Sequence, residues 1–174
     1  MSAVPKPPSL LSPDALAKIE REAAKYPAPH RQSAVMAALA IAQDEHGWLS
    51  KDVIEAVAAV LGMPAIAAYE VATFYAMYDT APPGRHKITV CTNLPCALSG
   101  GKRAAKRLQD RLGIGFNETT PDGCFTLKEG ECMGACGDAP VLLVNNVHMR
   151  CFMTPDEIDK LLAECNRSDS GVNS

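Results

Sequence analysis

Two pairs of cysteines are the residues of this chain whose type and spacing could do chemistry. The first pair, Cys91 and Cys96, lies in the stretch CTNLPC, with four residues between its members. The second pair, Cys132 and Cys136, lies in CMGAC, with three residues between its members. Thiolate sulfur is a soft ligand that selects zinc and iron–sulfur clusters. If the fold brings the two pairs together, the chain holds one metal centre with four thiolates.

The spacing within each pair helps to separate the candidate metals. Structural zinc sites most often use a knuckle in which two residues separate the cysteines, and neither pair here has that spacing. Wider loops suit a binuclear cluster in which each iron takes one pair. Gly134 and Gly137 would let backbone N–H groups approach the sulfurs, and such hydrogen bonds help to set reduction potentials. The residues therefore favour a 2Fe-2S cluster, with a zinc site and four unrelated buried thiols as the alternatives.

The helix expected after the first pair could contribute to the same site. It begins near Ser99 and Gly100, and its positive end would point toward an anionic cluster. Basic residues line this helix, and they could offset the charge of a cluster, meet an acidic partner, or simply face solvent. These basic residues are Lys102, Arg103, Lys106, Arg107 and Arg111.

The other titratable residues form no second site in the sequence. Cys124, Cys151 and Cys165 match no metal-binding pattern, and we expect ordinary packed or surface thiols. The C-x-x-C dithiol of thioredoxins is absent, and the four histidines lack the spacing of metal ligands. A glycine-rich dinucleotide fingerprint is also missing, so we expect the chain to bind neither NADH nor FMN with its own residues.

The composition favours a cytosolic protein of one domain or two small ones. The chain has 174 residues, of which 47% are hydrophobic, and a net charge of −3, which gives no reason to expect binding to nucleic acid or an anionic membrane. No apolar run is long enough to insert into a bilayer, and the N-terminus resembles neither a secretory signal nor a transit peptide. In a bacterial cytosol thiols stay reduced, so the seven cysteines are expected to be ligands or free thiols rather than disulfides.

The first half of the chain predicts a small helical bundle. Ser12 is a good N-cap with Pro13 at the first helical position, and Gly47 and Gly62 are typical helix stops. The last helix is expected to become strand-like at TFYAMY. The predicted helices cover residues 12–27, 31–47, 50–62 and 64–78.

The second half predicts a small α/β sandwich. Prolines and a glycine interrupt the helical pattern at 79–86, and strands and helices alternate after it. Asn145 and Asn146 are expected to form a tight hairpin turn, because asparagine tolerates positive φ. Strands are predicted at 87–91 and 124–130 and on both sides of the asparagines, and helices at 100–114 and 154–165.

The cysteine stretches and their surroundings resemble a known family. VCTNLPC and CFTLKEGECMGACGDAPVLLVN are similar to the small 2Fe-2S subunit of the NADH-oxidising module of complex I, NADH:quinone oxidoreductase. HGWLS and VATFYAMY also resemble the N-terminal helical region of that family, so the resemblance covers most of the chain. It implies a thioredoxin-like domain whose single 2Fe-2S cluster is bound by Cys91, Cys96, Cys132 and Cys136.

The resemblance also implies a partner and a role. The partner would be a larger flavoprotein subunit that carries FMN, the NADH site and a 4Fe-4S cluster, within a membrane-attached complex on the cytoplasmic side of the inner membrane. The 2Fe-2S cluster would hold one electron after hydride transfer to FMN, and the chain alone would be an electron carrier. The alternatives are the equivalent subunit of a soluble NAD-linked formate dehydrogenase or NAD-reducing hydrogenase, and, in another class, a zinc-stabilised interaction module. A free-standing thioredoxin-like ferredoxin is a third alternative, and the N-terminal helical region argues against it.

Two local expectations follow from the same resemblance. Ala139 and Pro140 resemble the cis-proline that precedes a strand in thioredoxin-like folds, so we predict a cis peptide bond there. Cys124 stands where the family pattern leads us to expect another residue, and it would offer a spare thiol near the site.

The expected fold is α+β, a small helical bundle followed by a thioredoxin-like α/β domain. The predicted parts are a mobile tail at 1–10, the bundle at 11–78, a linker at 79–86, the thioredoxin-like 2Fe-2S domain at 87–166 and a disordered tail at 167–174.

Overall fold

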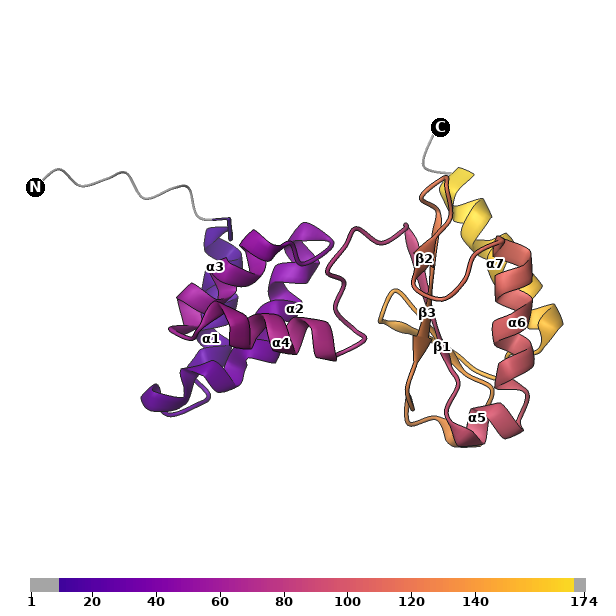
Figure 1. The fold of residues 1–174 in the computed structure, drawn as a ribbon, viewed down its shortest axis with the longest axis horizontal. Helices are drawn as coiled ribbons and strands as arrows, with labels where there is room; N and C mark the ends of the chain where they lie inside the picture. The colour runs from indigo at the N-terminus through magenta and orange to yellow at the C-terminus, as the bar shows by residue number, and fades with distance from the viewer. Residues whose placement is uncertain (1–9, 171–174) are drawn as a thin grey trace, which may run out of the picture. The chain divides into compact units, whose positions relative to one another are not determined.

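The computed structural model describes residues 10–170 and divides the chain into two compact units between Pro82 and Pro83 (Figure 1). Most of the tail predicted at 1–10 lies outside the described residues, as do the last four residues of the tail predicted at 167–174. The final helix continues to Ser170, past position 166 where we expected the ordered domain to end. Among residues 10–170, no helix is long and apolar enough to cross a bilayer.

The N-terminal unit is a helical bundle, as the sequence predicts. Ile19, Leu39 and Ile54 come from three different helices and are fully buried in one shared core. The elements are α1 (Pro13–Ala23), the 3-10 helix η1 (Ala28–Ala34), α2 (Val35–His46), α3 (Lys51–Leu61) and α4 (Ala65–Phe74).

The predicted helix caps and helix stops in this unit are confirmed. The hydroxyls of Ser12 and Ser50 each accept a hydrogen bond from the backbone N–H three residues further on. Gly47 and Gly62 follow α2 and α3 with φ angles of 79° and 68°, the left-handed conformation that glycine adopts without strain.

Three boundaries differ from the prediction. α1 ends at Ala23 rather than at Pro27, and the Lys25 and Tyr26 N–H groups donate to carbonyls three residues back, as in a tightened last turn. The helix expected from residue 31 begins instead as η1, and α2 starts at Val35. α4 stays helical to Phe74, and residues 75–78 form a turn and irregular backbone instead of the expected strand. Ala68 and Ala72, one helical turn apart, both pack into the bundle.

The C-terminal unit is a five-stranded mixed sheet in the order β2-β3-β1-β4-β5. β1 and β3 are parallel, and the other neighbouring pairs are antiparallel. Figure 1 shows α6 and α7 on one face of the sheet, where Ile88, Leu127 and Leu142 are fully buried. The strands are β1 (His86–Cys91), β2 (Glu118–Thr119), β3 (Phe125–Gly130), β4 (Leu142–Val144) and β5 (His148–Arg150); the helices are α5 (Leu94–Leu98), α6 (Gly101–Leu112), η2 (Cys136–Asp138) and α7 (Pro155–Ser170).

The hairpin between β4 and β5 is confirmed. Asn145 and Asn146 have φ angles of 52° and 60°, and the Val147 N–H donates to the Val144 carbonyl. The sequence analysis missed α5 and β2, because elements of five and two residues are too short to show a periodic pattern.

The predicted linker at 79–86 is anchored at both ends. The N–H of Asp79 donates to the Gln43 side chain, and its carbonyl accepts from the Leu49 N–H within the bundle. Gly84 donates to the Thr126 hydroxyl, and Arg85 donates to the backbone of the turn before β3. These bonds leave residues 80–83 as the connecting segment.

Candidate metal centre

Two parallel strands end side by side at the cysteines. In the register of β1 and β3, Cys91 lies opposite Gly130, and these residues are the last of their strands. Cys132 follows Gly130 by two residues, so the segments that carry the two cysteine pairs begin at the same end of the sheet. The pairing of β1 with β3 therefore brings together two stretches that lie about 40 residues apart in sequence.

The loop between β3 and β4 is fixed beside Cys91 at both of its ends. The Thr92 N–H donates to the Gly130 carbonyl at 3.3 Å, where the loop begins. The Cys91 N–H donates to the Val141 carbonyl at 3.2 Å, where the chain returns to the sheet. The segment that carries Cys132 and Cys136 thus closes around the end of β1.

The first cysteine pair is buried. Cys91 is 2% exposed and Cys96 is 1% exposed, and both pack against Val141. Cys91 is the last residue of β1, and Cys96 belongs to the short helix α5. Asn93 begins this helix, accepting from the Leu94 N–H.

Asn93 also connects the two cysteine segments. Its side-chain Nδ2 donates to Oε2 of Glu131, the residue just before Cys132, at 2.9 Å. The sequence analysis did not identify this contact, because neither residue type signals a partner 38 positions away. The bond holds the turn after Cys91 against the start of the second cysteine loop.

The second cysteine pair is exposed, and its sulfur atoms are close together. The Cys132 and Cys136 Sγ atoms are 3.7 Å apart. Two thiolates bound to one tetrahedral metal ion at about 2.3 Å are separated by about 3.8 Å. The Gly134 N–H donates to the Cys132 sulfur at 3.4 Å, with Gly134 at a φ of 76°, so the predicted approach of a backbone N–H is confirmed at this glycine.

The cysteines influence one another across the two pairs. Burial raises the pKa of the Cys91 thiol, and hydrogen bonds from the Asn93 and Met133 N–H groups lower it in part. The hydrogen bond with the Cys132 thiol raises the pKa of Cys136, and ionisation of Cys91 raises it further. Metal binding must therefore displace protons from these thiols.

The four thiols lie as two pairs rather than as one converging group. Within residues 10–170, no three side chains of the His, Cys, Asp and Glu type are arranged as ligands of a single metal ion. One pair is already spaced like two ligands of one metal ion, and the other pair is buried next to it. Four sulfur donors in this pairwise arrangement fit a 2Fe-2S cluster, which contains two metal ions.

The start of α6 packs directly on the first pair. A Cβ atom added to Gly101 would lie 2.8 Å from the Cys96 carbonyl oxygen and 3.1 Å from that of Cys91. α6 begins at Gly101, with Gly100 before it, close to the predicted start. The first turn of this helix therefore lies against the backbone of both buried cysteines.

The prediction that Cys124 lies near the site is wrong. Cys124 precedes β3, so the length of that strand places it about 20 Å from the site. It is buried in the core with Cys165, and both are packed thiols. Cys151 instead packs against the Cys91 and Cys96 group, which the sequence analysis missed because that contact depends on the pairing of β4 with β5.

The chain near the second pair has two unusual backbone features. The peptide bond between Ala139 and Pro140 is cis, as predicted. Phe152 has a φ of 53°, which is rare for a bulky residue, and its N–H donates to the Asp138 carbonyl in η2. This bond ties the segment after β5 to the turn that contains Cys136.

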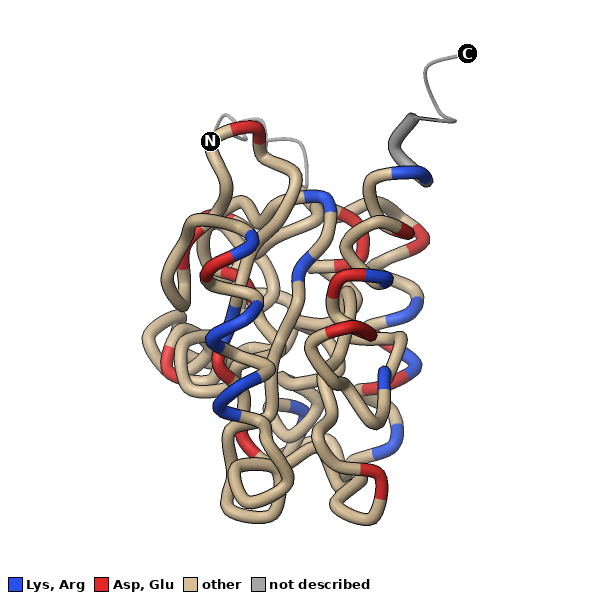
Figure 2. The backbone as a smooth tube through the Cα atoms, turned by 90° about the vertical axis from the view of Figure 1, so that its right-hand side faces the viewer, with Lys and Arg blue, Asp and Glu red and all other residues tan. Residues whose placement is uncertain are grey.

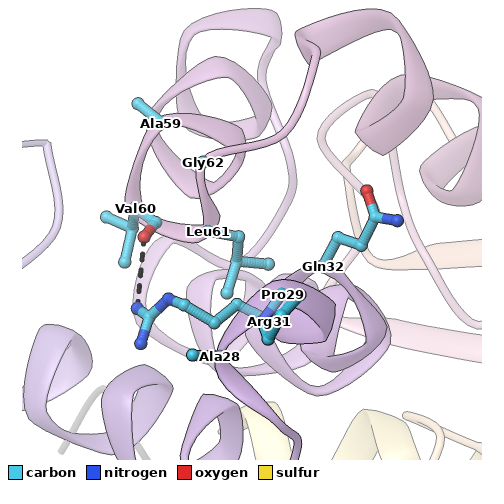
Figure 3. A pocket seen from close by; sticks show the side chains of 8 residues that line it. All are labelled: Ala28, Pro29, Arg31, Gln32, Ala59, Val60, Leu61 and Gly62. Atoms are coloured by element: carbon cyan, nitrogen blue, oxygen red, sulfur yellow. Dashed lines mark hydrogen bonds between the residues drawn. The ribbon is translucent and has the colours of Figure 1, made fainter.

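A pocket of about 330 Å³ lies in the bundle (Figure 3). Its cation, Arg31, donates to the Val60 carbonyl at 3.4 Å and pairs with Glu20 at 2.8 Å. With its charge compensated in this way, the pocket offers no reactive group comparable to the cysteines.

Comparison with known proteins identifies similar sequences over most of the chain. The family model described as "Thioredoxin-like [2Fe-2S] ferredoxin" matches residues 19–166. One subunit of the NADH-quinone oxidoreductase of Rhizobium meliloti is 48% identical over 129 residues, which cover 74% of this chain and 76% of that protein. The corresponding NADH-quinone oxidoreductase subunit of Rickettsia felis is 43% identical over 141 residues, covering 80% of this chain and 84% of the relative.

A solved structure shares the fold at low sequence identity. The crystal structure of an NAD+-reducing [NiFe]-hydrogenase in the H2-reduced state matches with a TM-score of 0.63 and 19% identity. The match covers 74% of this chain and 22% of the hydrogenase chain. At this identity the likeness establishes the fold alone.

Replacing Gly101 by alanine tests whether α6 must start this close to the cysteines. Alanine at a helical position is favoured over glycine by about 0.5–1 kcal/mol, but the added Cβ would lie 2.8 Å from a backbone oxygen. Because backbone atoms cannot move aside as a side chain can, we expect overpacking to dominate, with a net loss of about 1–2 kcal/mol. Urea unfolding and the metal content per chain should both show a loss.

Gly137→Ala is the matched control. Gly137 is next to Cys136, but a Cβ there would meet nothing within 4 Å, so we expect stability and metal content close to those of the unmodified chain. Equal losses in the two variants would show that the cysteine loop, and not the position of α6, is sensitive to substitution.

Proposed function

Because the chain belongs to the thioredoxin-like [2Fe-2S] ferredoxin family, we propose that it is the 2Fe-2S electron-transfer subunit of NADH-quinone oxidoreductase, complex I. The observation that carries the proposal is the parallel register of β1 and β3, which places Cys91 beside the loop of Cys132 and Cys136. The identity of 48% to a subunit of NADH-quinone oxidoreductase supports the assignment to this enzyme.

Four cysteines are the proposed ligands of the cluster. Cys91 and Cys96 would hold one iron, and Cys132 and Cys136 the other. The short distance between the two exposed sulfur atoms supports the second half of this assignment, and the shared burial of the first pair supports the other half. Cys124 and Cys165 are buried elsewhere in the core and are not candidates.

The residues around the cysteines have separate tasks. When bound, a 2Fe-2S cluster supplies a centre that accepts and releases one electron. Val141 and the partly buried Met133 exclude water from the inner side of the site. The N–H groups of Asn93, Met133 and Gly134 are directed at cysteine sulfur and stabilise its negative charge.

The electron would be exchanged with FMN in a partner flavoprotein subunit, which also carries the NADH site and a 4Fe-4S cluster. The chain has no glycine-rich dinucleotide fingerprint, which supports placing hydride chemistry on another subunit. We infer a peripheral position on the cytoplasmic side of the inner membrane, as part of the larger complex.

The alternative assemblies have weaker support. The match to an NAD+-reducing hydrogenase has 19% identity, whereas the subunits of NADH-quinone oxidoreductase reach 43–48%. We therefore prefer complex I to a hydrogenase or a formate dehydrogenase. A zinc-stabilised interaction module would differ from all of these in its metal content.

Substituting the four cysteines one at a time tests the ligand assignment. Each variant removes one thiolate: Cys91→Ala, Cys96→Ala, Cys132→Ala or Cys136→Ala. We expect the iron content to fall from about two atoms per chain to nearly none, with loss of the visible absorption of the cluster. Cys165→Ala is the control, because this thiol is buried in the core away from the site. If one of the four variants keeps its full iron content, that cysteine is not a ligand.

The dependence on a partner tests the proposed function. We expect that NADH does not reduce the cluster of the purified chain. When the flavoprotein subunit is co-expressed and bound, we expect NADH to reduce it. Low-temperature EPR of the two samples measures the reduced cluster directly. Reduction of the isolated chain by NADH at the same rate would contradict the assignment of hydride chemistry to the partner.

A further inference from the structure

The first turn of α6 carries only basic charges, whereas the first turns of three other helices each contain an acidic residue. α1, α3 and α7 have Asp14, Asp52 and Asp156 in their first turns, where negative charge complements the positive end of the helix dipole. The first turn of α6 has no acidic residue, and Lys102 and Arg103 stand there instead. Cations in this position are unfavourable unless an anion lies close by.

No side chain caps this helix start. Gly100 occupies the N-cap position with a φ of 101° and has no side chain that could accept from the first N–H groups of the helix. Its carbonyl accepts from the Arg103 and Ala104 N–H groups. A Cβ on Gly100 would lie 3.1 Å from Nη2 of Arg103, so the guanidinium is folded back over the start of the helix. Two cations and the positive end of the helix dipole thus lie at the same end of α6.

This end of α6 is the one that contacts the proposed cluster ligands. Gly101 packs against the carbonyl oxygens of Cys91 and Cys96. The stretch of residues 91–101 has no charged residue of its own, so it supplies no anion to balance the two cations. The four thiolates of a bound cluster are the group that would supply negative charge here.

The basic residues further along α6 are already paired. Lys106 pairs with Asp110, and Arg107 and Arg111 both pair with Asp159 on α7. Figure 2 shows the basic positions along this helix, with acidic positions beside its later turns. In the described part of the chain, no carboxylate pairs with Lys102 or Arg103. These two cations therefore differ from the other basic residues of α6, whose charges are paired.

We propose that Lys102 and Arg103, together with the start of α6, raise the reduction potential of the cluster bound by the four cysteines. This inference depends on the proposed function. Reduction adds one electron, and therefore one negative charge, to a centre that is already anionic, and nearby cations stabilise the reduced state more than the oxidised state. The burial of Cys91 and Cys96 strengthens this effect, because less water lies near these sulfurs to screen the charges.

A redox titration of the full-length, cluster-loaded chain tests the proposal. In the double variant Lys102→Gln/Arg103→Gln we expect a more negative midpoint potential, corresponding to a loss of about threefold or more in the equilibrium constant for reduction. The shift should shrink as salt is added, since ions screen exposed charges. Arg103→Lys keeps the charge and should retain most of the potential of the unmodified chain.

The double variant Lys106→Gln/Arg111→Gln is the matched control, because it removes the same charge from the same helix at paired positions. We expect its midpoint potential to stay close to that of the unmodified chain. An unchanged potential in the Lys102 and Arg103 variant, or an equal shift in the control, would overturn the proposal. If the unmodified chain contains no iron and sulfide, the proposed function itself fails, and the two failures are thereby distinguished.

Discussion

The parallel pairing of β1 with β3 is the constraint on which the rest of the site depends. It sets Cys91 opposite Gly130, so that the two cysteine segments leave the sheet at one edge. The hydrogen bonds of the Thr92 and Cys91 N–H groups then fix both ends of the second segment. A shift of this register by one residue would reverse the side of the sheet on which each side chain lies. Cys91 would then face away from its present neighbours.

The site has an inner and an outer half. Cys91 and Cys96 are buried, whereas Cys132 and Cys136 reach the surface. A buried half keeps water from part of the centre, and an exposed half lets a partner approach it closely. Such an arrangement suits a protein that exchanges electrons with a neighbouring chain. α6 also affects the site, because its first turn lies against the backbone of the buried cysteines.

The sequence predicts features that depend on neighbouring residues and misses those that depend on strand pairing. Ser50 and Gly62 mark the ends of α3 correctly, because helix caps are local signals. The two cysteine pairs were also recognisable from their spacing and surroundings. The sequence did not show which further thiol lies near these pairs, because Cys124 and Cys151 lie at opposite ends of the sheet's strands. The bond from Asn93 likewise joins residues that only the fold brings together.

The central claim is that the two cysteine pairs form one binuclear redox site. Low-temperature EPR of the anaerobically purified, dithionite-reduced chain tests it most directly, with iron and acid-labile sulfide measured on the same sample. The account predicts an S = ½ signal with about two irons and two sulfides per chain. A silent spectrum with zinc in place of iron would contradict it and leave a structural module that does not carry electrons.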